Sequence, residues 1–295
     1  MATPIDRGPD GSETASEIEV GGTVRRVAIL TTGLHPCACY VARRLRRSGA
    51  EIFLINQVRL AVEPDSPAFF KRLLSRRGLW ITLDYLLFVA LKRSILAARR
   101  LAGGASPAES ESSVACMRPD PGIVSEDWLR YVEVTDVNRS PDRERLAEIG
   151  PDLILLAGAP ILFRRTIEAA RIACINPHCG ITPRYAGSAP YEWAVYERRF
   201  EDVGFTVHLV VPKVDSGPIL WQERVEWDPR RPLRELSPLL GQRMYDKMIE
   251  IAQGMIAGRR YRGRPQQGGP TKPPAGLTTR VLAEIRRRGY ARRLR

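Results

Sequence analysis

The sequence has few of the residues that bind metals or form disulfide bonds. Its 295 residues include three histidines and five cysteines, and no two cysteines form a C-x-x-C pair. An odd number of scattered cysteines does not make a disulfide framework, and a zinc site normally needs clustered cysteine or histidine ligands. The sequence therefore predicts no metal centre and a reducing compartment, which we expect to be the cytoplasm.

Long apolar runs are also missing. The most apolar stretch, residues 78–91 (GLWITLDYLLFVAL), falls short of the roughly 20 residues that cross a bilayer, and it has Asp84 in its middle. The first 20 residues are polar and acidic, without the basic-then-apolar order of a secretory signal. We expect neither a membrane span nor a signal peptide.

Positive charge is concentrated in one segment. The net charge is +13, and residues 257–295 contain twelve Lys and Arg against a single acid, Glu284. A nucleic-acid-binding fold usually spreads its basic residues over a folded face instead. We interpret residues 257–295 as a basic C-terminal extension, which either is solvated or meets an anionic partner.

Short apolar runs alternate with helical patterns through the rest of the chain. The apolar runs cover residues 26–31, 51–55, 131–134, 152–157, 173–175 and 204–211. The helical patterns cover residues 38–47, 143–149, 163–170 and 233–256. This alternation predicts an α/β fold with a Rossmann-like, doubly wound, mostly parallel sheet flanked by helices.

Two segments depart from this alternation. Residues 1–24 are rich in Gly, Ser, Thr and acids, and we expect a disordered N-terminal tail. Residues 61–130 form a helical insertion whose pattern at residues 67–101 is apolar on all sides and flanked by basic pairs. Such a helix is either buried in its own domain or a homodimer, or lies on an anionic membrane as a peripheral contact. We predict one main domain, residues 25–256.

Three polar residues follow predicted strands. Asn176 and His178 come directly after the run at residues 173–175, and Asp215 follows the run at residues 204–211. Ligands of open α/β sheets bind outside the carboxyl ends of the strands, so these side chains should meet at one site. An amide, an imidazole and a carboxylate suffice to stabilise an oxyanion and move protons while an acyl group passes to an amine.

Each of these residues also has an ordinary structural explanation. Asn at a strand end is commonly a turn former, a single His is usually a hydrogen-bonding core residue, and Asp-Ser-Gly is a common turn. Cys179 beside His178 suggests a nucleophile, but its side chain should point to the opposite side of the extended chain. Only the combination of motifs favours a functional site.

That combination resembles a known family. Residues 176–187 (NPHCGITPRYAG) are similar to the N-x-H…P-x-Y-x-G motif of the folate-dependent formyltransferases. Residues 204–208 and 215–220 are similar to the G-x-T-x-H and D-x-G-x-I elements of the same family. The family includes glycinamide ribonucleotide, methionyl-tRNA and sugar N-formyltransferases. The resemblance covers residues 26–256 and is weakest over residues 60–130.

The resemblance implies specific roles. Asn176, His178 and Asp215 would be the catalytic residues, and 10-formyltetrahydrofolate would be the co-substrate, without a metal. The pterin would lie between two loops, where the implied cofactor-binding residues are Gly158, Ile161, Leu162, Val211 and Val214. The acceptor would be a small-molecule amine, with an amino-sugar nucleotide as our expectation. His208 matches a strand histidine of the family, to which we assign a supporting role.

Departures from the family pattern narrow the choice of acceptor substrate. Gly180 replaces a serine that often follows the histidine, and residues 32–37 do not reproduce the phosphate loop of the purine enzyme. The residues after 256 are too few for the C-terminal domain of the tRNA enzyme, so tRNA is not an expected partner. Two alternatives stay open. One is a formyltetrahydrofolate hydrolase, although its usual N-terminal regulatory domain has no counterpart here. The other is a non-catalytic peripheral binding protein that uses the basic extension.

Overall fold

The computed structural model describes residues 17–58, 120–187, 190–231, 233–266 and 271–272, with scattered helical positions between residues 71 and 94. Every described position between residues 71 and 94 is helical, as the pattern at residues 67–101 predicts. The rest of the insertion up to residue 119, most of the predicted N-terminal tail and residues 273–295 lie outside the described residues.

The centre of the fold is a seven-stranded sheet with strand order β4-β3-β2-β5-β6-β8-β9. Its strands are β2 (Arg26–Thr32), β3 (Glu51–Gln57), β4 (Leu129–Val134), β5 (Leu153–Leu156), β6 (Ala173–His178), β8 (Gly204–Leu209) and β9 (Ile219–Arg224). The five strands from β4 to β6 are parallel, whereas β8 runs antiparallel to both of its neighbours. The predicted α/β class with a mostly parallel sheet is confirmed.

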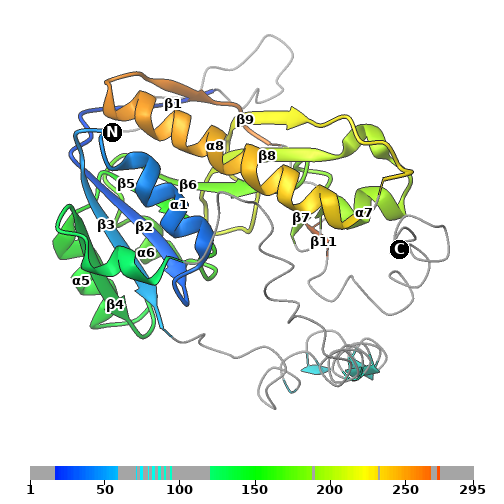
Figure 1. Ribbon diagram of the computed structural model, residues 1–295, viewed down its shortest axis with the longest axis horizontal. Helices are drawn as coiled ribbons and strands as arrows, with labels where there is room; N and C mark the ends of the chain where they lie inside the picture. Colours follow the sequence, from blue (N-terminus) through cyan, green and yellow to red (C-terminus); the bar gives the residue numbers. More distant parts are fainter. Residues whose placement is uncertain are drawn as a thin grey trace, which may run out of the picture.

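Helices cover both faces of this sheet (Figure 1). Helices α1 (Pro36–Leu45) and α8 (Leu236–Ile256) pack together on one face, and α5 (Asp142–Ile149) and α6 (Arg164–Ile167) pack on the other. Alternate residues of β2 divide between the two cores, with Val27 on the α1 side and Ala28 on the α5 side. Strands buried on both faces read as continuous apolar runs, which is why the sequence revealed them.

The backbone N–H groups of the turn before α1 already have hydrogen-bond acceptors within the protein. Pro36 occupies the first helical turn and has no N–H group. Four backbone N–H groups of the turn already donate within the protein, those of Gly33, Leu34, His35 and Cys37. A helix N-terminus at this place in an α/β fold often binds a phosphate. Here those donors are occupied.

Segments from the N-terminal and C-terminal parts of the described chain lie side by side (Figure 1). Strand β1 (Ile18–Val20) pairs antiparallel with β10 (Tyr261–Gly263), and exposed ion pairs join Arg260 to Glu19 and Arg262 to Glu17. Strand β11 (Thr271–Lys272) pairs parallel with β7 (Ala186–Gly187). Described strands thus lie on both sides of the predicted domain of residues 25–256, whose boundaries stay a prediction. Local sequence patterns do not reveal strands that form only when acidic and basic segments far apart in the chain meet.

The leucines at the described helical positions between residues 71 and 94 are exposed. Leu74, Leu79, Leu83, Leu86 and Leu87 have exposed fractions between 40% and 57%. The expected burial of this helix is therefore absent at these positions, and contact with a second copy or with a membrane stays a prediction. None of the helices in the described part of the chain combines the length and the apolarity needed to span a membrane.

Candidate active site

The three predicted catalytic residues come from one strand end and the loop after the next strand. Asn176 and His178 lie within the carboxyl end of β6, where β8 places His208 opposite Asn176 and Thr206 opposite His178. Asp215 lies between β8 and β9 with a φ of +49°, a left-handed conformation in which Asp is more frequent than most residues. The antiparallel pairing places Leu209, the end of β8, beside Ile175 of β6, so the loop that follows β8 and carries Asp215 begins next to Asn176.

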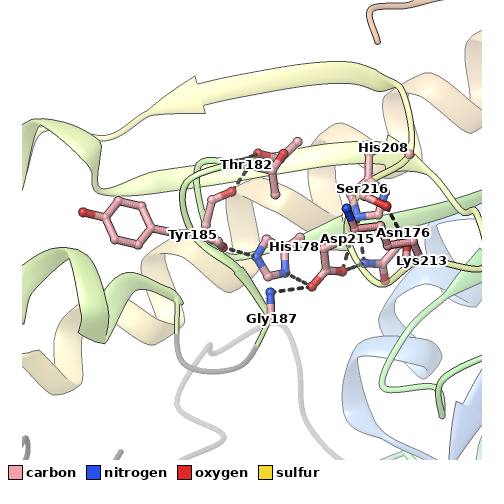
Figure 2. A network of polar contacts seen from close by, with 12 residues as sticks. Asn176, His178, Thr182, Tyr185, Gly187, His208, Lys213, Asp215 and Ser216 are labelled. Carbon is pink, nitrogen blue, oxygen red and sulfur yellow. Dashed lines mark hydrogen bonds and ion pairs between the residues drawn. The ribbon is translucent and has the colours of Figure 1, made fainter. Parts of the chain in front are cut away.

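The carboxylate of Asp215 lies at the centre of the site (Figure 2). Its Oδ2 is 3.4 Å from Nδ1 of His178 and accepts a 2.9 Å hydrogen bond from the backbone N–H of Gly187. Its Oδ1 is 3.5 Å from Nε2 of His208 and 3.4 Å from Nδ2 of Asn176. The structure therefore brings the three predicted residues together and adds His208 to them.

The two imidazoles make different hydrogen bonds. Nε2 of His178 donates to the carbonyl of Tyr185 at 2.7 Å, and the other nitrogen faces Asp215. Nδ1 of His208 donates to the carbonyl of Leu209 at 2.8 Å, which leaves Nε2 to accept from Asn176 at 3.2 Å. A carbonyl only accepts, so each bond fixes one protonated nitrogen. The amide of Asn176 is held between His208 and Asp215.

Burial and charge set the protonation of the central pair. Burial lowers the pKa of His178, and the charge of Asp215 and the carbonyl of Tyr185 oppose this shift. Burial alone would raise the pKa of Asp215, but the contact with His208, the charge of His178 and the N–H of Gly187 lower it overall. At neutral pH, Asp215 is thus a carboxylate beside a neutral ring that can accept a proton.

We expect His178 to titrate below its ordinary pKa of 6.5. The variant Asp215→Asn should lower the pKa of His178 further, because removing the carboxylate leaves the effect of burial less opposed. Any reaction that needs the neutral ring should lose kcat/KM as the pH falls through this pKa. An NMR titration of the His178 ring measures this pKa in the wild type and in the variant. A higher pKa in the variant would contradict the assigned contact between His178 and Asp215.

A cavity of ≈160 Å³ opens beside this cluster. Four of the five predicted cofactor-binding residues line it, namely Ile161, Leu162, Val211 and Val214. Asn176, His208 and Asp215 line the same cavity, whereas His178 does not. The predicted slot between the loop after β5 and the loop after β8 is therefore present, with polar groups at one side and apolar walls elsewhere.

Residues 124–247, which include this cluster, match the family model described as formyl transferase. The matched segment, which is less than half of the chain, is thus similar to a formyl transferase domain. Methionyl-tRNA formyltransferase of Limosilactobacillus fermentum is 30% identical over 46% of this chain and 43% of its own length. That of Thermotoga maritima is 26% identical over 48% of this chain and 45% of its own length. This chain thus spans less than half the length of these curated relatives.

The fold of the chain is similar to that of solved structures. A sugar N-formyltransferase from Shewanella sp. superposes with a TM-score of 0.51 and 14% identity, covering 84% of this chain and 76% of that chain. At this identity, the likeness shows the fold alone. It agrees with the mostly parallel sheet and flanking helices described above.

Gly158 lies at the start of the loop after β5, which lines the cavity, but Gly158 itself does not line it. Its φ is +72°, and an added Cβ would lie 2.8 Å from the ring of His35. Its carbonyl accepts a 3.0 Å hydrogen bond from the N–H of Thr32. Gly158, one of the predicted cofactor-binding residues, thus allows the backbone turn at the start of the loop.

The surroundings of Cys179 are not those of a nucleophilic cysteine. Burial, followed by the negative charge of Glu192, raises the pKa of this thiol to about 12. Reactive cysteines have lowered pKa values and lie in electropositive surroundings. Within the described part of the chain, no three His, Cys, Asp or Glu side chains are grouped so that they could hold a metal ion.

Proposed function

We propose that this protein is an N-formyltransferase that moves the formyl group of 10-formyltetrahydrofolate to a primary amine. The observation that carries the proposal is the carboxylate of Asp215, held between His178 on one side and Asn176 and His208 on the other. This cluster borders an apolar cavity within the segment that matches the formyl transferase model.

The chemistry needs one bond to form and one to break. The amine nitrogen bonds to the formyl carbon, and the bond between that carbon and the folate nitrogen breaks. The attacking nitrogen loses a proton and the folate nitrogen gains one, while the formyl oxygen carries negative charge in between. The N–H group of Asn176 that makes only a long 3.4 Å contact with Asp215 suits that oxygen, and a preorganised donor of this kind contributes about 3 kcal/mol.

Neutral His178 can accept the proton that the attacking nitrogen loses, because Asp215 stabilises the imidazolium that forms. Proton transfer by such a positioned group typically accelerates a reaction on the order of 10²- to 10⁴-fold. Since His178 does not line the cavity, a water between the ring and the reacting nitrogens completes the path in this proposal.

The cavity suits the pterin end of the folate. Whole ligand sites usually measure roughly 300–1,000 Å³, so a cavity of ≈160 Å³ takes one end of a larger molecule. Apolar residues from both loops cover the faces of a flat ring, among them Ile161 and Val214, which are 65% and 37% exposed at its mouth.

The variant Val214→Asp should weaken binding of 10-formyltetrahydrofolate about tenfold. Losing the contact of a Val side chain costs about 1.5 kcal/mol, and about 1.4 kcal/mol corresponds to a factor of ten. Val124→Asp is a matched control, because Val124 is also 37% exposed but lies in the turn Pro121–Ser125, away from the cavity. Fluorescence titration with the folate measures both dissociation constants. Equal losses in the two variants would contradict the slot.

As a narrower proposal, the acceptor is an amino-sugar nucleotide. The occupied N–H groups at residues 33–37 support this acceptor by elimination, because they disfavour a phosphate bound before α1, as glycinamide ribonucleotide would require. Methionyl-tRNA, the acceptor named in the curated relatives, competes with it and belongs in the test.

The test is an incubation of the full chain with 10-formyltetrahydrofolate and one amine at a time. The amines are a nucleotide-linked amino sugar, glycinamide ribonucleotide and methionyl-tRNA, and mass spectrometry detects a product that gains one formyl group. Transfer to the amino sugar supports both proposals, and transfer to another amine supports only the broader one. Formate release without an amine, at the rate of transfer, would replace the proposal by a hydrolase, and no turnover with any amine would overturn it.

A further inference from the structure

We propose that residues 261–266, from the basic extension, are part of the active site and that Gln266 is a positioning residue for Asp215. The inference rests on the proposed function for its effect on turnover. Its structural basis is a series of contacts between this segment and residues 215–219, the loop that carries the catalytic carboxylate.

The segment first joins the end of that loop like an added strand. Arg264 and Ile219 exchange two backbone hydrogen bonds, of 2.9 Å and 2.7 Å. One residue earlier, the backbone of Gly263 approaches Pro218 so closely that an added Cβ would lie 2.9 Å from Cβ of Pro218. The extension is therefore fixed against the loop at two consecutive positions.

Gln266 then reaches the catalytic residue itself. Its Nε2 donates to the backbone carbonyl of Asp215 at 3.3 Å and to the carbonyl of Gly217. Its Oε1 is buried and has no hydrogen-bond partner among the described residues. Burying the oxygen of an amide without a hydrogen-bond partner destabilises a fold. The favourable contribution of this side chain therefore comes from the two hydrogen bonds that its Nε2 donates to the loop.

The loop needs such support because its backbone is unusual. Asp215 has a φ of +49°, and Gly217 lies so close to Leu209 that an added Cβ would be 1.8 Å from the Leu209 carbonyl oxygen. The direction of the Asp215 carboxylate follows from this backbone. Two hydrogen bonds from Gln266 to carbonyls on either side of Ser216 therefore fix the carboxylate between the two imidazoles.

The extension also meets the other side of the carboxylate. Strand β11 pairs with β7, and Figure 1 shows the two strands side by side. Gly187 of β7 donates its N–H to Oδ2 of Asp215. The segment expected from its charge to be an accessory extension thus contacts both backbones that hold the catalytic acid.

The experiment compares Gln266→Met with Gln253→Met in the full chain. Methionine keeps the length of glutamine and removes the donors. Gln253 is the matched control, because its Nε2 also donates to a backbone carbonyl, that of Arg44, on an exposed part of the surface. The readouts are hydrogen exchange of the amides at residues 212–219, the pKa of His178 by NMR, kcat and the KM for the folate.

In Gln266→Met we expect exchange at residues 212–219 to be about tenfold faster and kcat to fall about tenfold, the effect of losing typical hydrogen bonds. The KM for the folate should stay within twofold, and the pKa of His178 should fall because Asp215 opposes its burial less well. Gln253→Met should change none of these values.

Unchanged exchange in Gln266→Met would overturn the inference, as would faster exchange with normal kcat or a rise in KM alone. Failure of the proposed function is a separate result, because wild-type protein would then transfer no formyl group. In that case the exchange rates and the pKa of His178 still decide whether Gln266 positions Asp215.

Discussion

Replacing Asp215 by asparagine is expected to lower the kcat of formyl transfer about 10³-fold. Asparagine has nearly the same size and keeps an oxygen that accepts from the N–H of Gly187. It removes the negative charge 3.4 Å from His178 that stabilises the imidazolium formed during proton transfer. The measurement is initial-rate kinetics with the amine found in the acceptor screen.

The control for this substitution is Asp228→Asn. Asp228 is partly exposed and forms a surface ion pair with Arg230, so the same chemical change there should leave kcat within twofold. Circular dichroism and thermal unfolding should show both variants folded. A folded Asp215→Asn variant that keeps more than a tenth of the wild-type kcat would remove Asp215 from the proton path.

Replacing Gly217 by alanine is expected to lower kcat at least about 100-fold and to lower the melting temperature. The added Cβ would lie 1.8 Å from the backbone carbonyl oxygen of Leu209, a contact that neither backbone can keep. The loop must therefore move, and it carries Asp215 away from His178. A misplacement of about 1 Å at a catalytic group can cost on the order of 10²-fold.

Gly241→Ala provides the control for adding a methyl group to a glycine. Gly241 lies in α8, and no atom lies within 4 Å of an added Cβ. Alanine in an open helical position should stabilise the protein by about 1 kcal/mol and leave kcat unchanged. A Gly217→Ala variant as active and as stable as Gly241→Ala would show that the loop is not held against Leu209.

The central parallel strands could be predicted because they are buried on both faces. All four residues of β5 are buried, and a short apolar run of this kind is typical of a strand at the centre of a parallel sheet. Strand β9 and helix α7 (Pro190–Tyr196) escaped prediction. In β9 only Ile219 is buried, so the strand shows neither an apolar run nor a clear alternation.

The candidate site was predictable only as far as motifs and strand ends reach. Asn176, His178 and Asp215 follow from motifs, and the apolar cavity residues follow from the loops after β5 and β8. The position of His208 depends on the antiparallel register of β8 against β6, which fixes its partner as Asn176. Gln266 comes from a segment whose composition indicates only charge, and its contact depends on tertiary structure.

The thiol of Cys179 can report motion beside the active site. Cys179 follows β6 and is only partly exposed, and with a pKa of about 12 its thiol stays protonated, so alkylating reagents should react with it slowly until this strand end opens locally. The rate of modification at this single atom would therefore report how often the strand end beside His178 separates from its neighbours, and a ligand seated nearby would slow it.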